Sequence, residues 1–569
     1  MSLRSNLVAP ISRLARDGVN VARSWSPSRR AQVREYTTRR RVGLAILHDL
    51  SSRDTPDPVF TNVLVDGQWD NANFWTRYAF LRRALGLAKV NEVGVVGEFS
   101  RDPVAEAFTA FGIDDVRDFG RHVRHRRRFR RQAEDLLSRT SRPEEILAWQ
   151  LPNGFPATIV YDGVLKRQRR GVVDLNDPML VDYVAEALSA VQHADDLLED
   201  CRADLLVTSH AVDFAHTALI WAAVTRGAKV IVLYGDYGSA RFIRIDGQDQ
   251  VFSYPGRPNR GDWESLSPVQ YASLAENGMA YLRQRFGGDT GDVGAVYAYQ
   301  RRSERVSRRD IAAHYGWDPQ KPIIAVYASN WFDYPHFTDS MPYRDFVDWM
   351  AITIDAATAN SDANWLFKAH PCDEWYGKIN GVTLADMLAD NDQDHIALME
   401  TSWTGHDVLE AIDGLVTCHG TAGIEAAAVG TPVLVAYPGW YSDADFAVTC
   451  RSPEAYAATL ETAWWTASDM AACSRQARAF AGWYFCVPDW QGSYVFPDDA
   501  NQNAIWRGLP NFLNEHRDAI DKEIAMLREW TVAADPYYHV FKMSRALGYR
   551  SPERERGLVE GIAETGAAA

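Results

Sequence analysis

The chain has 569 residues, 46% of them hydrophobic and 24% charged, and its 60 Lys and Arg against 75 Asp and Glu give a formal net charge of −15. This composition excludes collagen, coiled coils and wholesale disorder, and it is sufficient for two large α/β domains with buried cores. No run of about 18 apolar residues occurs, and no signal peptide is recognisable near the start. Together with six scattered cysteines, these features predict a cytoplasmic protein without disulfides or structural zinc.

Residues 1–41 are predicted to form a basic arm, with ten Arg against two acidic residues. One interpretation is an arm attracted to anionic lipid at the inner face of the membrane, which would make the protein peripheral. The other is an arm that packs on the acidic remainder of the protein, and the sequence leaves both open. A second basic run, RHVRHRRRFRR at 121–131, has no accompanying nucleic-acid-binding motif. We therefore expect no nucleic-acid partner, and interpret this run as a solvated helix face or a surface for an anionic acceptor or membrane.

The next segment, 42–310, alternates short apolar runs with amphipathic stretches, as parallel βαβ units do. The periodicity predicts helices over 75–85 and 214–225, and strands over 42–46, 92–97, 204–208 and 229–233.

The segment 311–510 repeats the pattern, with strands predicted over 322–327, 364–368, 395–399, 414–418 and 432–436. Both halves are therefore predicted to be doubly wound parallel sheets. Residues 511–548 have a helical period and are expected to cross back over the first domain, whereas 549–569 are expected to be a disordered tail.

The most informative segment is 414–437, GLVTCHGTAGIEAAAVGTPVLVAY, which indicates a strand, a glycine-rich turn, a helix and a second strand. Gly420 and Gly423 would let the backbone approach a ligand, and free N–H groups at the helix start can accept a phosphate. Glu425 would accept hydrogen bonds from two ribose hydroxyls. The alternative is an ordinary βαβ unit whose glycines only cap its elements.

This segment, together with Lys368-Ala369-His370-Pro371 at the end of an earlier strand, resembles the nucleotide-sugar site of GT-B glycosyltransferases. The similarity is greatest to the capsular polysaccharide biosynthesis proteins that include bacterial Kdo transferases, and UDP-N-acetylglucosamine 2-epimerases contain similar segments. The resemblance implies an α/β fold of two facing Rossmann-like, doubly wound domains, with the acceptor bound by the first, 42–310, and the nucleotide-sugar by the second, 311–510. It also implies that the nucleotide-sugar is bound by Lys368, His370, Pro371, His419, Gly420, Thr421, Gly423 and Glu425.

His370 follows a predicted strand and precedes a proline, so its imidazole is expected to project from the strand end. As a cation it would neutralise the phosphate of the leaving nucleotide. The alternative is a hydrogen-bonded structural histidine. The carboxylates in this half do not form a metal-binding pattern at a strand end, and we expect neither a metal nor another cofactor.

Glycosyl transfer needs a general base if configuration inverts, or a nucleophile if a covalent intermediate forms. The candidates in the first half are Asp236, Asp213 and His210, which follow predicted strands, although Asp213 could instead cap a helix. The polar loop 65–73 is a candidate for acceptor binding through Asp66, Gly67 and Asp70, or is a plain surface loop.

These observations predict a glycosyltransferase that moves a sugar from a nucleotide-sugar donor, CMP-Kdo-like by the resemblance, to a surface or capsular polysaccharide acceptor, either a glycan or a glycolipid. Three alternatives stay open: a nucleotide-sugar epimerase, a CDP-polyol phosphotransferase, and a non-catalytic carbohydrate-binding protein with the GT-B fold.

Overall fold

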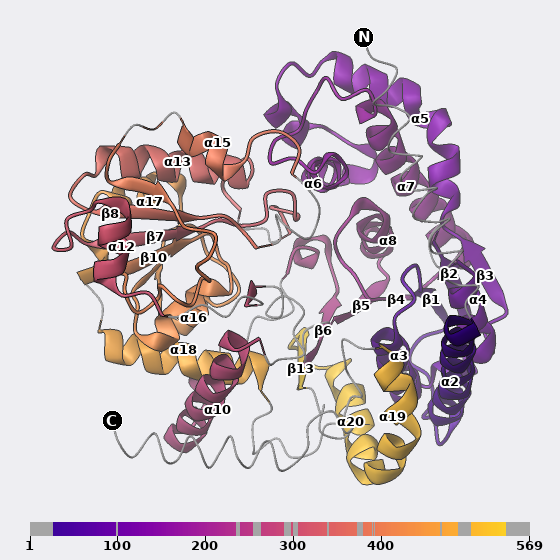
Figure 1. The fold of residues 1–569 in the computed structure, drawn as a ribbon. Helices are drawn as coiled ribbons and strands as arrows, with labels where there is room; N and C mark the ends of the chain where they lie inside the picture. Colours follow the sequence, from indigo (N-terminus) through magenta and orange to yellow (C-terminus); the bar gives the residue numbers. More distant parts are fainter. Residues whose placement is uncertain are drawn as a thin grey trace.

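The computed structural model describes residues 27–97, 101–234, 239–253, 263–288, 298–299, 305–337, 341–371, 379–389, 391, 393–466, 469–486 and 502–541. Their strands form two separate sheets, which lie in two lobes of the molecule (Figure 1). Asp236, the first catalytic candidate, lies outside the described residues, as do residues 1–26 and the tail 549–569.

The first sheet has seven strands in the order β13-β6-β5-β4-β1-β2-β3. Strands β1 to β5 are parallel, whereas β6 pairs antiparallel with both β5 and β13. The strands are β1 (Asn62–Asp66), β2 (Asn91–Val96), β3 (Asp115–Asp118), β4 (Leu205–Thr208), β5 (Lys229–Tyr234), β6 (Ser239–Ile245) and β13 (Tyr537–Phe541). The helices of this lobe are α2 (Pro27–Ser52), α3 (Ala72–Leu85), α4 (Arg101–Ala110), α5 (Arg121–Ser138), α6 (Ala157–Gln168), α7 (Leu180–Cys201) and α8 (Phe214–Thr225).

The second sheet has six strands, all parallel, in the order β12-β11-β10-β7-β8-β9. They are β7 (Ile323–Tyr327), β8 (Asn364–Lys368), β9 (Ile396–Leu398), β10 (Gly414–Thr417), β11 (Val433–Val435) and β12 (Val448–Thr449). The helices are α10 (Pro268–Phe286), α12 (Arg308–Tyr315), α13 (Phe346–Ala359), α15 (Leu384–Ala389), α16 (Ala422–Val429), α17 (Pro453–Leu460) and α18 (Met470–Phe485).

The expected fold class, two Rossmann-like doubly wound α/β domains, is confirmed. The central strands are short and almost wholly apolar, and every residue of β4, β7 and β10 is buried, because helices cover both faces of a parallel sheet. The helix predicted over 214–225 and the strand predicted over 364–368 have these same bounds in the structure.

The strand predicted over 42–46 is wrong, because these residues lie inside helix α2. Leu44 and Leu47 are fully buried, whereas Val42 is 51% exposed, which is the spacing of one helical face rather than of a strand. Gly43 permits the contact with the C-terminal helices, since a Cβ there would lie 2.5 Å from the Trp506 ring.

The last described elements, α19 (Gln502–Glu515), α20 (Arg517–Trp530) and β13, all pack on the first lobe. Figure 1 shows α19 and α20 beside α2 and α3. The helical prediction is wrong for residues 537–541, which form an edge strand. The segment Tyr537–Phe541 is rich in aromatic and β-branched residues, follows Pro536 and pairs with β6.

Glu523 of α20 is fully buried beside Tyr538, whose hydroxyl donates a hydrogen bond to its carboxylate. Burial raises the pKa of Glu523 from 4.5 to about 8, against the smaller opposing effect of that hydrogen bond. Its protonation therefore stabilises the fold fully below about pH 4.5, and this stabilisation is lost as the pH rises toward 8.

We expect Glu523→Gln to unfold at the same temperature as the wild type at pH 4, and to be more stable by on the order of 4 kcal/mol at pH 9. Thermal unfolding across this range measures the difference. The exposed Glu529 of the same helix, replaced by Gln, is the control. Parallel pH profiles for wild type and Glu523→Gln would contradict the prediction.

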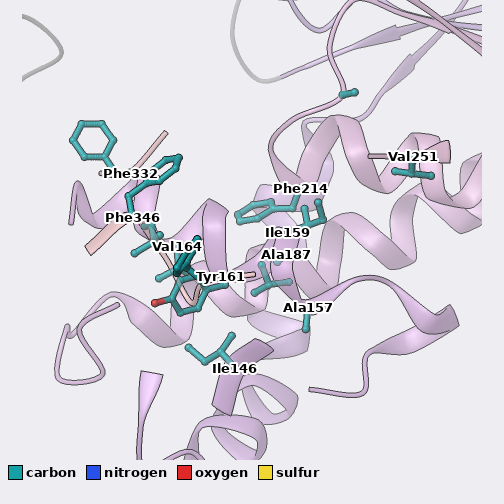
Figure 2. Packing of buried hydrophobic residues seen from close by; sticks show 14 of the residues in the cluster. Ile146, Ala157, Ile159, Tyr161, Val164, Ala187, Phe214, Val251, Phe332 and Phe346 are labelled. Carbon is teal, nitrogen blue, oxygen red and sulfur yellow. The ribbon is translucent and has the colours of Figure 1, made fainter. Parts of the chain in front are cut away.

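Helix α6 joins the two lobes through a shared hydrophobic core. Figure 2 shows Tyr161 and Val164 of α6 near Phe332 and Phe346, which belong to the second lobe. The Tyr161 hydroxyl donates a 2.7 Å hydrogen bond to Asp345. The lobes are thus held by buried contacts rather than by a linker alone.

Candidate functional site

Ligands of doubly wound sheets bind outside the carboxyl ends of the strands, where the strand order reverses. In the first sheet this switch point lies between β1 and β4, and in the second sheet it lies between β7 and β10. The loops that follow these four strands are therefore where a functional site is expected.

Asp66 ends β1, is 1% exposed and contacts the imidazole of His216. The distance from Asp66 Oδ2 to His216 Nδ1 is 2.7 Å, and the Thr208 hydroxyl donates to the same carboxylate oxygen at 2.9 Å. The backbone N–H of Gln68 donates to Asp66 Oδ1 at 3.1 Å. These bonds fix the carboxylate, which in turn fixes the histidine ring.

Local structure explains how the two residues meet. Gly67 lets the chain leave β1 close to α4, since a Cβ there would lie 2.8 Å from Val104 and Phe108. His216 stands in the first turn of α8, which Asp213 caps by accepting a hydrogen bond from the N–H of Ala215. The first turn after β4 is thereby placed against the end of β1.

The pair has the electrostatics of an aspartate–histidine dyad. Burial alone would lower the pKa of His216, but Asp66 outweighs this effect and the pKa is raised. Burial likewise opposes ionisation of Asp66, yet His216 and the hydrogen bonds lower its pKa. Within the described part of the chain, Nε2 of His216 has no hydrogen-bond partner, so this nitrogen can accept a proton from a ligand.

The other first-lobe candidates have structural partners. Asp213 forms an ion pair with Arg167 at 2.9 Å and accepts a hydrogen bond from the Tyr334 hydroxyl at 3.2 Å. Burial opposes its ionisation, but Arg167 lowers the pKa of Asp213 to about 2, which makes it a weak base. His210 lies next to the dyad, with its Nδ1 2.9 Å from the Ser209 hydroxyl.

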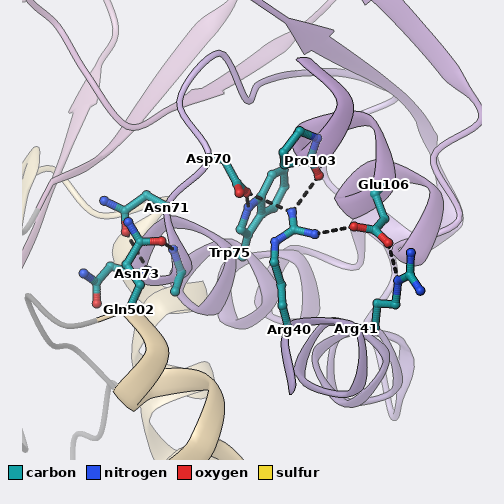
Figure 3. A network of polar contacts seen from close by, with 10 residues as sticks. Arg40, Arg41, Asp70, Asn71, Asn73, Trp75, Pro103, Glu106 and Gln502 are labelled. Carbon is teal, nitrogen blue, oxygen red and sulfur yellow. Dashed lines mark hydrogen bonds and ion pairs between the residues drawn. The ribbon is translucent and has the colours of Figure 1, made fainter. Parts of the chain in front are cut away.

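Asp70 is also part of the framework. It accepts hydrogen bonds from Arg40 Nη2 and from Trp75 Nε1, both at 2.9 Å (Figure 3). Arg40 is 3% exposed and also pairs with Glu106. Arg40 belongs to the predicted basic arm. Through these contacts it attaches helix α2 to the first lobe.

In the second lobe, two buried polar atoms at the switch point have no hydrogen-bond partner among the described residues. They are Nδ2 of Asn330, after β7, and Nδ1 of His419, after β10. Asn330 is only 5% exposed. No side chain caps the start of α16, which Thr421 opens directly after Gly420. The first backbone N–H groups of this helix donate to local carbonyls, Gly423 to Gly420 and Ile424 to Thr421, so the unpartnered side-chain nitrogens are the groups left to meet a polar ligand.

The other predicted donor-binding residues have varied surroundings. Burial and the charge of Lys368 lower the pKa of His370 to about 4, so the imidazole is neutral at pH 7 and not the expected cation. Lys368 Nζ donates to the Ala369 carbonyl at 3.2 Å, and Pro371 follows at the edge of the described segment. Gly423 serves packing, since a Cβ there would lie 2.3 Å from the Tyr441 hydroxyl.

Glu425 is 5% exposed and already holds two partners. Its carboxylate accepts hydrogen bonds from Arg285 Nε and from the Tyr299 hydroxyl, each at 2.6 Å. The residue thus ties α10 to α16, and any ribose contact would share oxygens already engaged.

The two switch points are brought together by contacts between their loops. The Tyr334–Asp213 hydrogen bond joins the loop after β7 to the loop after β4. Lys166 of α6 pairs with Asp333 at 2.6 Å, and the charge of Asp333 also acts on His370. The loop after β4, which precedes His216, is therefore in contact with the loop after β7 of the second lobe.

Sequence reasoning missed the dyad, although it named Asp66 as an acceptor contact and His216 as part of a helix. The available signal was an aspartate that ends one strand and a histidine in the first turn after another. In the described residues, no cluster of three or more His, Cys, Asp and Glu side chains could hold a metal. None of the described helices is both long and apolar enough to cross a bilayer.

No protein-family model and no curated protein matches the chain. Among solved structures, it is similar to UDP-GlcNAc 2-epimerase from Neisseria meningitidis bound to UDP-GlcNAc, with 9% identity over 74% of this chain and 95% of that chain and a TM-score of 0.23. It is similar to a β-Kdo 2,4-transferase from Thermosulfurimonas dismutans, with 14% identity over 50% and 79% of the two chains and a TM-score of 0.29. For a spinosyn rhamnosyltransferase complexed with thymidine diphosphate, the identity is 10% over 79% and 100%, with a TM-score of 0.25. At such low identities and TM-scores, activity has to be inferred from this chain's own residues.

Proposed function

We propose that this protein is a glycosyltransferase that moves a sugar from a nucleotide-activated donor to an acceptor hydroxyl. The observation that carries the proposal is the buried Asp66–His216 dyad, which lies at the switch point of the first sheet, beside the loop after β4 that contacts the second lobe. The buried, unpartnered Nδ2 of Asn330 and Nδ1 of His419 support an anionic donor in the second lobe.

In the proposed reaction, Nε2 of His216 takes the proton of the acceptor hydroxyl as its oxygen attacks the anomeric carbon. The bond from that carbon to the donor phosphate breaks, and the nucleotide leaves with the electron pair. Asp66 keeps the proton of His216 on Nδ1 and stabilises the imidazolium that forms. A base with this geometry favours direct displacement with inversion, and a neutral His370 would donate an N–H to the leaving phosphate.

The experiment is a panel of UDP-, GDP-, CMP- and TDP-sugars, with release of free nucleotide measured in the wild type and in His216→Asn. We expect release from one donor class, at a rate that His216→Asn lowers by at least about 100-fold. Isothermal titration with the corresponding free nucleotide should give about tenfold weaker binding for Asn330→Ala, because a donor to phosphate is lost. The control is Asn391→Ala, at the amino end of the same sheet, where Asn391 bonds to Thr358.

Absence of nucleotide release and of nucleotide binding across the panel would overturn the proposal. Interconversion of the donor sugar without transfer would indicate an epimerase that uses the same phosphate site.

A further inference from the structure

Among the tryptophans that the structure describes, Trp69 alone is exposed, with 53% of its surface accessible to water. It lies three residues after Asp66, in the loop that leaves β1. The other tryptophans in the described part are buried or half-buried. Beside a candidate site, an aromatic ring open to water presents a face on which a ring of a ligand can stack.

The indole of Trp69 is held in one orientation by ring stacking. It stacks on His210 with centroids 4.7 Å apart and planes at 10°. His210 in turn stacks on His216, with centroids 5.2 Å apart and planes at 26°. The three rings form a ladder from the surface to the dyad.

The same carboxylate links both ends of this ladder. Asp66 Oδ2 contacts His216, while Asp66 Oδ1 accepts the N–H of Gln68, the residue before Trp69. The Ser209 hydroxyl, 2.9 Å from His210 Nδ1, fixes the middle ring. The side chains of Trp69 and His210 are thus already ordered before a ligand binds. Stacking of a ligand on the open face of the indole therefore costs little additional conformational entropy.

The spacing of the ladder restricts which part of a ligand lies on Trp69. Two ring spacings, 4.7 and 5.2 Å, separate the indole from the His216 imidazole. A ring stacked on the open indole face adds a third spacing, so its own hydroxyls do not reach His216. The group that reacts must belong to a different part of the same acceptor.

We propose that Trp69, supported by His210, is a subsite for a sugar ring of the acceptor that is remote from the reacting hydroxyl. The acceptor is then an oligosaccharide of more than one pyranose ring, whose apolar C–H face covers the indole. This inference rests on the proposed function, because it takes His216 as the position of the reacting hydroxyl.

The test is isothermal titration of malto-, cello- and chito-oligosaccharides of one to six rings with wild-type protein, Trp69→Ala and Trp69→Phe. We expect at least one series to bind the wild type more tightly as the number of rings increases, with a plateau once the remote subsite is filled. Trp69→Ala should lose the gain with length, a weakening of about tenfold for the longer members, and Trp69→Phe should recover part of it.

Binding that is independent of length, equal affinity of wild type and Trp69→Ala for the longer oligosaccharides, or no binding of any series would overturn the proposal. Nucleotide release by the wild type, measured in parallel, decides the proposed function separately. Release without length-dependent glycan binding rejects the Trp69 subsite alone, and length-dependent binding without release rejects only the transferase.

Discussion

Replacing His216 by asparagine is expected to lower the rate constant for transfer by about 10²- to 10⁴-fold, the usual contribution of a general base. Nucleotide affinity should stay within a few-fold of the wild-type value, because the proposed donor-binding groups lie in the other lobe. Steady-state kinetics and isothermal titration on the same preparations measure the two quantities. The control is His314→Asn, a histidine on the second lobe whose side chain is 44% exposed.

The pH dependence of the transfer rate follows from the direction in which the pKa of His216 is shifted. His216 acts as a base only when neutral, and its pKa is raised above 6.5 by Asp66, so the rate should increase with pH through that raised value. Asp66→Asn removes the negative charge beside His216. The pH range over which the rate rises, the acid limb of the profile, should therefore move to lower pH, and the maximal rate should fall. An acid limb that stays in place in Asp66→Asn would contradict the electrostatic coupling, and a His216→Asn rate near that of wild type would remove the dyad from catalysis.

Replacing His336 by alanine is expected to destabilise the junction of the two lobes by about 3 to 5 kcal/mol, because the buried Asp162 carboxylate loses its imidazole partner and keeps only the hydrogen bond from the backbone N–H of residue 336. His336 Nδ1 lies 2.7 Å from Asp162 Oδ1, and the two residues are 7% and 2% exposed. The pair joins α6 to the segment after β7. Differential scanning calorimetry should show a lower midpoint for the transition that separates the lobes.

The comparison within the same interface is Lys166→Ala. Lys166 pairs with Asp333 at 2.6 Å, but their side chains are 23% and 45% exposed, so its loss should cost under about 1 kcal/mol. The double variant Asp162→Asn with His336→Phe should recover part of the loss, since no buried charge remains and the Asn oxygen can still accept the backbone N–H of residue 336. Equal destabilisation by His336→Ala and Lys166→Ala would show that burial of the ion pair is not what matters.

Much of the fold follows from local patterns in the sequence. Short apolar runs that alternate with amphipathic stretches are sufficient to predict parallel βα units, and the strand over 364–368 and the helix over 214–225 have the predicted bounds. A parallel sheet covered on both faces needs such runs wherever it lies in the chain, so this signal does not depend on distant residues. The apolar run at 42–46 was misassigned because so short a run fits one face of a helix as well as a strand.

The candidate site shows the limit of the sequence. Asp66 and His216 are separated by 150 residues, and only the reversal of strand order between β1 and β4 brings them to 2.7 Å. The pattern around Asp213 suited a catalytic carboxylate, but Arg167 of another helix converts it into an ion-paired helix cap. Similarly, burial makes His370 neutral where its sequence context suggested a cation. The sequence by itself determined which elements form and which loops follow their strands. The tertiary structure decided which side chains meet and which protonation states they hold, because both depend on burial and on partners from distant segments.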